Sequence, residues 1–108
     1  MRFSQLLKQV LLVCVSLFAL TGQAMADLVA DANRAYDAGN YVKAEKLWRL
    51  AAEQGNVQAQ WTLGRLYDAR DIPFGVAKNS KEAEKWYRKA AEQGNESAQL
   101  NLGLMYLA

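Results

Sequence analysis

The chain has 108 residues, enough for one small domain, and a formal net charge of +2 at pH 7. It contains one cysteine and no histidine, which excludes Cys-His and Ser-His catalysis and leaves only an all-carboxylate zinc site. A glycine-rich phosphate loop is also missing, so we expect no cofactor and no metal.

The first 26 residues have the pattern of a secretory signal peptide. Arg2 and Lys8 give the segment a positive start, and an apolar run from Val10 to Leu20 follows them. That run is short for a membrane span, which needs about 20 apolar residues. We therefore expect an exported protein, periplasmic or secreted, whose processed form has no stable membrane span. The alternative is a leader that is not cleaved and stays as an N-terminal anchor.

A small-x-small tripeptide ends this segment and predicts where it is cleaved. Ala24 and Ala26 are separated by one residue, which places the cleaved bond between Ala26 and Asp27. Cleavage there would remove the only cysteine, Cys14, and two of the 13 basic residues. The remaining segment, 27–108, would have 11 basic and 11 acidic residues. Because proteins that bind nucleic acid normally have a basic patch, we do not expect nucleic acid as a partner.

An internal repeat organises the rest of the chain. The phrase Ala-Ala-Glu-Gln-Gly-Asn begins at Ala51 and occurs again at Ala90, 39 residues later. Agreement of this extent in a short chain indicates duplication and favours a solenoid built from repeats. The same offset aligns Ala44 with Ala83, Trp48 with Tyr87, Leu63 with Leu102, Gly64 with Gly103 and Tyr67 with Tyr106.

Each repeat unit is predicted to be a helical hairpin. Apolar residues in 41–54 recur at the i, i+3, i+4, i+7 spacing of one helix face. Gly55 can end that helix in a left-handed cap, and Asn56 can cap the next helix. Alternating helices without a strand pattern predict an all-α fold, a right-handed α/α solenoid of about two and a half hairpins after the signal peptide. The predicted helices are 28–38, 41–54, 57–69, 80–93 and 96–107, forming hairpins at 28–54 and 57–93 and an unpaired helix at 96–107.

One face of each predicted helix should be buried. The repeated aromatic positions recur at helical spacing, so we interpret them as core and not as a ligand-stacking array. Glycine inside a helix costs about 0.8–1 kcal/mol relative to alanine, so Gly64 and Gly103 indicate close approach of a neighbouring helix. The residues predicted to be buried are Ala44, Leu47, Trp48, Ala51, Ala59, Leu63, Leu66, Tyr67, Ala83, Trp86, Tyr87, Ala90 and Tyr106.

The repeat resembles a known family. The segment from Ala83 to Gly94, followed by Ala98-x3-Leu102-Gly103-x2-Tyr106, is similar to the Sel1-like repeat, a branch of the tetratricopeptide-like helical solenoids, and the chain resembles the bacterial exported members. The resemblance covers nearly all of 27–108. It implies an adaptor that binds a protein or peptide on its concave surface, without catalysis. The chain departs from the family in the segment around Pro73, which is longer than usual by about three residues.

The candidate binding residues lie on the third and fifth predicted helices. Trp61 falls off the predicted buried face, so its indole should be partly exposed. In the solenoids that the chain resembles, this helix of each hairpin lines the concave surface, and tryptophan and arginine are enriched at binding hot spots. The alternative is that these residues only pack between hairpins. The candidates for the protein-binding surface are Gln58, Trp61, Thr62, Arg65, Leu100, Asn101 and Leu104.

Two other functions stay open from the sequence. Some exported, cysteine-rich relatives of the Sel1 type bind or hydrolyse β-lactams, but this chain lacks their paired cysteines and a nucleophile with a base. A second alternative is a non-functional remnant of a longer repeat protein. The predicted helix 96–107 is too apolar for the polar cap that a solenoid needs. We favour truncation as the explanation, and the alternative is that this end docks onto a partner or self-associates.

Overall fold

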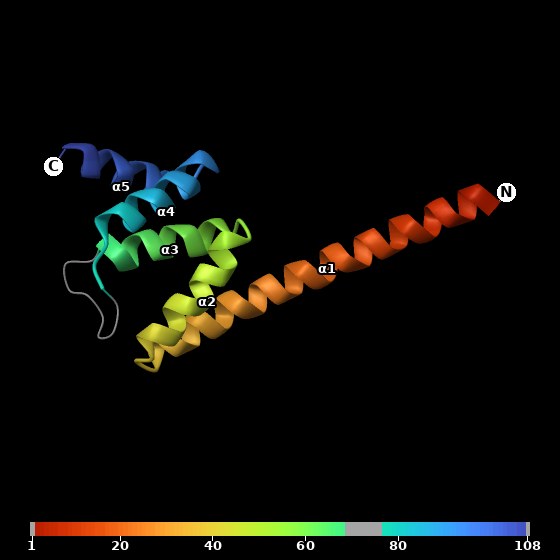
Figure 1. Ribbon diagram of the computed structural model, residues 1–108, viewed down its shortest axis with the longest axis horizontal. Helices are drawn as coiled ribbons and strands as arrows, with labels where there is room; N and C mark the ends of the chain where they lie inside the picture. Colours follow the sequence, from red (N-terminus) through yellow and green to blue (C-terminus); the bar gives the residue numbers. More distant parts are fainter. Residues whose placement is uncertain (1, 69–76, 108) are drawn as a thin grey trace.

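The computed structural model describes residues 2–68 and 77–107, without the side chains of residues 2, 3 and 10–21. The loop around Pro73, whose conformation the sequence left open, lies outside the described residues. The described chain folds into α1 (Arg2–Asp37), α2 (Tyr41–Glu53), α3 (Val57–Asp68), α4 (Ser80–Glu92) and α5 (Glu96–Leu107) (Figure 1). No described residue belongs to a strand. The fold is an all-α solenoid, as the sequence predicts.

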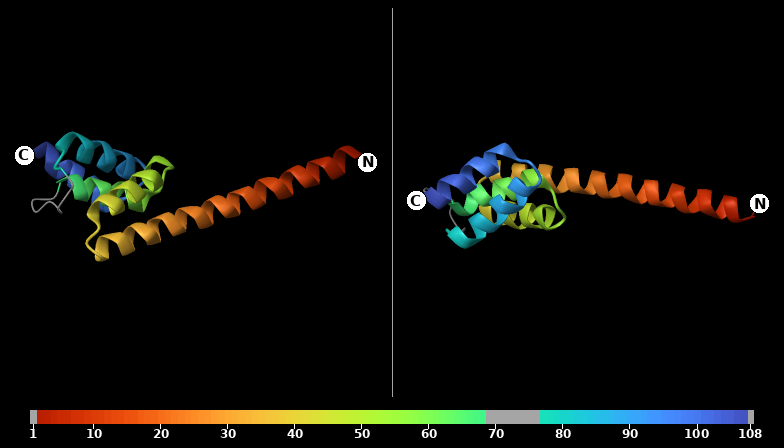
Figure 2. Two further views of the ribbon diagram at one scale, coloured as in Figure 1. Left: turned by 60° about the horizontal axis from the view of Figure 1, so that its bottom comes forward. Right: turned by 90° about the horizontal axis from the view of Figure 1, so that it is seen from above.

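The first helix is longer than the helix predicted at 28–38. It continues backwards through the leader to Arg2, and its N-terminal part extends away from the other helices (Figure 2). The helix crosses the predicted cleavage bond between Ala26 and Asp27 without interruption, and Gln23 Nε2 donates a hydrogen bond of 3.2 Å to Asp27 Oδ1. Among the described residues, no helix is long and apolar enough to cross a membrane.

The doubled phrase forms the turn between two helices. Gly55 and Gly94 have φ angles of 95° and 93°, a left-handed conformation that only glycine adopts without strain. The side-chain oxygens of Asn56 and Asn95 each accept a hydrogen bond of 2.8 Å from the backbone N–H three residues later. Asn79 caps α4 in the same way. Each copy of the phrase therefore ends one helix and begins the next, within one residue of the predicted bounds.

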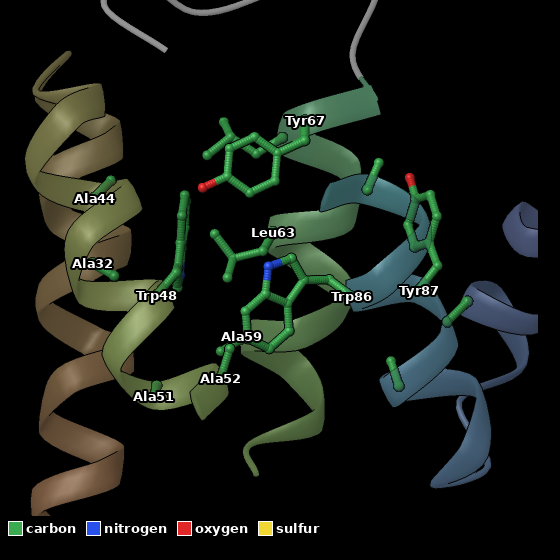
Figure 3. Close-up of a cluster of buried hydrophobic side chains, with 14 of the residues drawn as sticks. Ala32, Ala44, Trp48, Ala51, Ala52, Ala59, Leu63, Tyr67, Trp86 and Tyr87 are labelled. Carbon is green, nitrogen blue, oxygen red and sulfur yellow. The ribbon is translucent and has the colours of Figure 1, made fainter. Parts of the chain in front are cut away.

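The core lies between α2, α3 and α4. Trp86 and Tyr87 leave α4 on different sides, and Trp86 is directed toward Leu63 and Trp48 (Figure 3). Trp86, Tyr87 and Leu63 are the largest fully buried side chains among the described residues. Of the residues predicted to be buried on α2, α3 and α4, all are buried except Leu47, which is half-buried.

Close helix approach occurs at Gly64 but not at Gly103. A Cβ at Gly64 would lie 2.4 Å from Cδ1 of Tyr87, so this position must be glycine for α4 to pack on α3 at the observed separation. At Gly103, no heavy atom of the described residues beyond its chain neighbours and the backbone of α5 itself lies within 4 Å of where a Cβ would be. The close approach predicted there is therefore wrong for the described chain, because no described helix packs on α5 as α4 packs on α3.

The prediction that Tyr106 is buried is also wrong. Its side chain is 60% exposed, whereas the corresponding Tyr67 is 4% exposed. The hydroxyl groups of the two tyrosines nevertheless have equivalent partners. Tyr67 lies against Glu45 and Arg49, and Tyr106 lies against Glu84 and Arg88, 39 residues later. The polar contacts of this tyrosine are thus repeated, while its burial depends on a following helix.

Candidate protein-binding surface

Four of the candidate residues lie along α3. Gln58 and Arg65 are exposed, and Trp61 and Thr62 are half-buried. Thr62 Oγ1 donates a hydrogen bond of 2.7 Å to the Gln58 carbonyl, which is one helical turn away. This bond holds the hydroxyl on the helix, so Thr62 presents mainly its methyl group to its surroundings.

Trp61 and Arg65 form a stacked pair on α3. The guanidinium carbon of Arg65 lies 4.8 Å from the centroid of the Trp61 ring. A cation above an indole contributes about 0.5–1 kcal/mol at an exposed site, enough to restrict both side chains. The indole also packs against the core, and its Nε1 is buried with no hydrogen-bond acceptor among the described groups. Trp61 is therefore partly exposed, as predicted, and also packs within the fold.

The other three candidates lie on α5. Leu100 and Leu104 are 63% and 53% exposed, and Asn101 is half-buried. Leu100 and Leu104 stand where Trp61 and Arg65 stand in the preceding repeat. Two apolar side chains of α5 thus occupy the repeat positions that the stacked Trp61 and Arg65 occupy on α3.

The hydroxyl of Tyr87 connects the two helices. It donates a hydrogen bond of 3.3 Å to Asp68 Oδ2, and it also interacts with Arg65 and Asn101. Burial and the Asp68 carboxylate raise the pKa of Tyr87 well above its ordinary value, while Arg65 and Asn101 partly oppose this. The structure therefore brings together two of the candidates, Arg65 on α3 and Asn101 on α5, around one hydroxyl of α4.

Sequence reasoning missed the role of Tyr87 and Asp68 in this arrangement. Tyr87 was interpreted only as a core residue, and Asp68 lies 19 residues before it. No local spacing pattern links residues so far apart, because the contact exists only once α4 is packed on α3. In the part of the chain that the structure describes, no group of three His, Cys, Asp or Glu side chains could hold a metal ion.

Comparison with known proteins places these helices among repeat proteins. The profile of the Sel1 repeat matches residues 26–56, 57–95 and 96–108. The chain is also similar to a solved structure of c5321, with 48% sequence identity and a TM-score of 0.58. That protein is described as a protective antigen present in uropathogenic Escherichia coli strains that displays an SLR fold. The match covers 62% of this chain and 14% of that one, so the similarity spans only a small part of the c5321 chain. No curated protein matches the sequence significantly.

Proposed function

Because the chain belongs to the Sel1 repeat family, we propose that it is an exported scaffold that binds a protein or peptide partner on the surface of α3 and α5, without catalysis. Sel1 repeats generally serve as protein–protein interaction scaffolds. Stacked helical hairpins provide the extended concave surface that such binding uses.

The observation that carries this proposal is the stacked pair of Trp61 and Arg65. Tryptophan and arginine are the residue types most enriched at binding hot spots. Because the guanidinium group lies 4.8 Å from the indole centroid, much of the ordering that binding requires is already present in the free protein.

Asn101 and the exposed leucines extend this surface onto α5. Arg65 of α3 and Asn101 of α5 both act on the pKa of the Tyr87 hydroxyl, which lies between the two helices. Leu100 and Leu104 add exposed apolar area beside them. A partner that fits this surface would present an apolar segment to α5, and near Arg65 a carbonyl or a carboxylate.

The binding proposal is tested with a double variant. The full chain and Trp61→Ala/Arg65→Ala are used as bait in a periplasmic extract, and captured proteins are identified by mass spectrometry. Lys43→Ala/Lys46→Ala is the matched control, because both lysines are exposed on α2, away from the proposed surface. We expect a partner that wild type and the lysine variant retain and the Trp61/Arg65 variant loses. Reproducible capture of the same proteins by all three chains would contradict the proposal.

The export part rests on the leader pattern of residues 1–26. The description of the similar c5321 as a protective antigen also supports exposure outside the cytoplasm. Cell fractionation with N-terminal sequencing tests it directly. We expect the protein in the periplasm or medium with Asp27 as its first residue; an intact N-terminus in the cytoplasmic fraction would refute export.

A further inference from the structure

The lysines that follow the leader are confined to one layer of the fold. Between residues 27 and 107, every lysine lies on α2, on α4 or two residues before α4. None lies on that part of α1, on α3 or on α5, and all of these lysines are exposed. We call this set the lysine face, and its members are Lys43, Lys46, Lys78, Lys81, Lys85 and Lys89.

The lysine face belongs to the outer side of α2 and α4. The two helices are neighbours, since Arg49 Nη1 of α2 lies 3.5 Å from Glu82 Oε2 of α4. Helix α3 packs on both of them, and their buried residues include those that meet α3. The exposed sides of α2 and α4 therefore lie on the surface that faces away from α3.

A following repeat does not cover this side of a helix. Val42, Lys46 and Leu50 stand at four-residue spacing on one side of α2, and all three are exposed although α3 and α4 follow. The three equivalent positions on α4, 39 residues later, are those of Lys81, Lys85 and Lys89. The lysines of α4 thus stand on a side of the repeat that its neighbours leave open.

The positive charge of the lysine face is not neutralised within the fold. Every salt bridge among the described residues involves an arginine, so no described lysine is paired with a carboxylate. Three glutamates of α2 and α4 take part in these arginine pairs, namely Glu45, Glu82 and Glu84. Six lysines therefore stand against Glu53 and Glu92, an excess of 6 − 2 = 4 positive charges. Nζ of Lys85 and of Lys89 lie 4.7 and 5.3 Å from the centroid of the Trp86 ring, which holds these charges in place without removing them.

The chemistry of this surface fits lipid better than protein or nucleic acid. Lysine is depleted at protein interfaces, where arginine and aromatic residues are enriched, and its hydrated point charge does not need a partner of fixed geometry. Val42 and Leu50, 41% and 48% exposed, flank Lys46 on the same side of α2. A phosphate backbone gives such apolar side chains no partner, whereas the headgroup region of a bilayer accepts them beside lysines.

We propose that the lysine face adsorbs to an anionic lipid bilayer, with its ammonium groups at the lipid phosphates and with Val42 and Leu50 among the headgroups. Each lysine near such a bilayer strengthens adsorption about fivefold, so a cluster of this size needs no specific pocket. The surface around Trp61 lies on α3 and stays free for a protein partner. The inference goes beyond the proposed function, and each can fail without the other.

The test measures co-sedimentation of the full chain with lipid vesicles. Anionic vesicles contain equal parts of phosphatidylglycerol and phosphatidylcholine, and neutral vesicles contain phosphatidylcholine alone. Every variant keeps the leader, so a difference between variants reports on the folded helices. The lysine variant is Lys81→Gln/Lys85→Gln/Lys89→Gln. The matched control lowers the net charge by the same amount at exposed positions of α1 and α5, and it is Asn33→Glu/Ser97→Glu/Gln99→Glu.

We expect wild type and the control to bind anionic vesicles more tightly than neutral ones. The lysine variant should bind anionic vesicles at least about tenfold more weakly than wild type. Equal binding by wild type and the lysine variant, or an equal loss in the lysine variant and the control, would overturn the proposal. Val42→Ser/Leu50→Ser should also weaken vesicle binding. Vesicle binding that this pair leaves unchanged, together with equal affinity for double-stranded DNA, would show a general polyanion surface and overturn the assignment to lipid.

Orientation on the vesicle provides a readout that insertion of the leader cannot produce. A fluorescent dye is attached at Leu50→Cys on α2 or at Gln58→Cys on α3, in chains that also have Cys14→Ser. Lipids labelled with a nitroxide at the headgroup quench a dye that lies close to the bilayer surface. On anionic vesicles, we expect stronger quenching of the dye at position 50 than at position 58. Equal quenching at the two positions would mean that the leader alone holds the chain on the vesicle, and would overturn the proposal.

Discussion

The contrast between Gly64 and Gly103 gives the sharpest test of the packing described above. In Gly64→Ala, the new Cβ would lie 2.4, 2.5 and 3.0 Å from Cδ1, Cε1 and Cγ of Tyr87. The ring cannot move aside freely, because Tyr87 is 1% exposed and its hydroxyl is hydrogen-bonded to Asp68. Overpacking of this kind costs about 1–3 kcal/mol, and three ring carbons in conflict place it near the upper end of that range.

Alanine also favours the helix at this position. Replacing glycine inside a helix contributes about 0.8–1 kcal/mol of stabilisation, which leaves a net destabilisation of about 2 kcal/mol for Gly64→Ala. For a domain of this size, the midpoint of thermal unfolding should fall by about 8–16 °C. Gly103→Ala should gain the helix preference without the clash, since no heavy atom lies within 4 Å of its Cβ position. Its midpoint should therefore be unchanged or higher.

Thermal and urea unfolding, followed by circular dichroism at 222 nm, would measure both variants against wild type. Gly64→Ala should lower the midpoint, and Gly103→Ala should not. If Gly64→Ala were as stable as Gly103→Ala, the close packing of α4 on α3 would be refuted.

Three further predictions concern groups within the repeat. The pKa values of Tyr67 and Tyr87 are raised in the folded state, so the stability that the two protonated hydroxyls contribute should be present below pH 10 and be lost as the pH rises above it. Urea unfolding from pH 8 to 11 measures this loss, and an unfolding free energy that does not change with pH would contradict it. Gln60→Leu removes the hydrogen bonds of the buried Gln60 side chain to the Ala52 carbonyl and to Gln93 and should cost about 1–3 kcal/mol of unfolding free energy, more than Gln99→Leu at the exposed counterpart. Equal costs in urea titrations would argue against this difference. Asn56→Ala removes the side-chain cap of α3 and should lower the free energy of unfolding by about 1 kcal/mol. Urea titration measures this loss, and an unchanged unfolding midpoint would contradict the prediction.

The repeat itself was predictable because it depends on local chemistry. Helix faces, the turns at Gly55 and Gly94 and their asparagine caps follow from spacing and from glycine's access to left-handed backbone. These features recur wherever the phrase recurs. The length of α1 did not follow, because the apolar segment 10–20 was interpreted as a leader and its backbone state was not predicted.

Burial could not be carried from one repeat to the next. Tyr106 and Gly103 stand at the same positions of the repeat as Tyr67 and Gly64, yet they are exposed. A residue is buried by the helix that covers it, which is a tertiary contact and not a property of the motif. The convergence of Arg65 and Asn101 on Tyr87 was unpredictable for the same reason, since it requires three helices in their final positions.

The uninterrupted path of α1 across the bond between Ala26 and Asp27 would determine when the proposed cleavage of the leader could occur. Proteolysis requires locally opened backbone, so removal of the leader at that bond would have to precede closure of the first hairpin or wait for its N-terminal turns to fray. Cleavage would also take away Met25, which packs against the core. In exchange, Asp27 and Asp31 would then occupy the first turns of the shortened helix, where carboxylates interact favourably with the helix dipole. The acidic pair would thus stabilise a helix end that cleavage at the predicted bond would create.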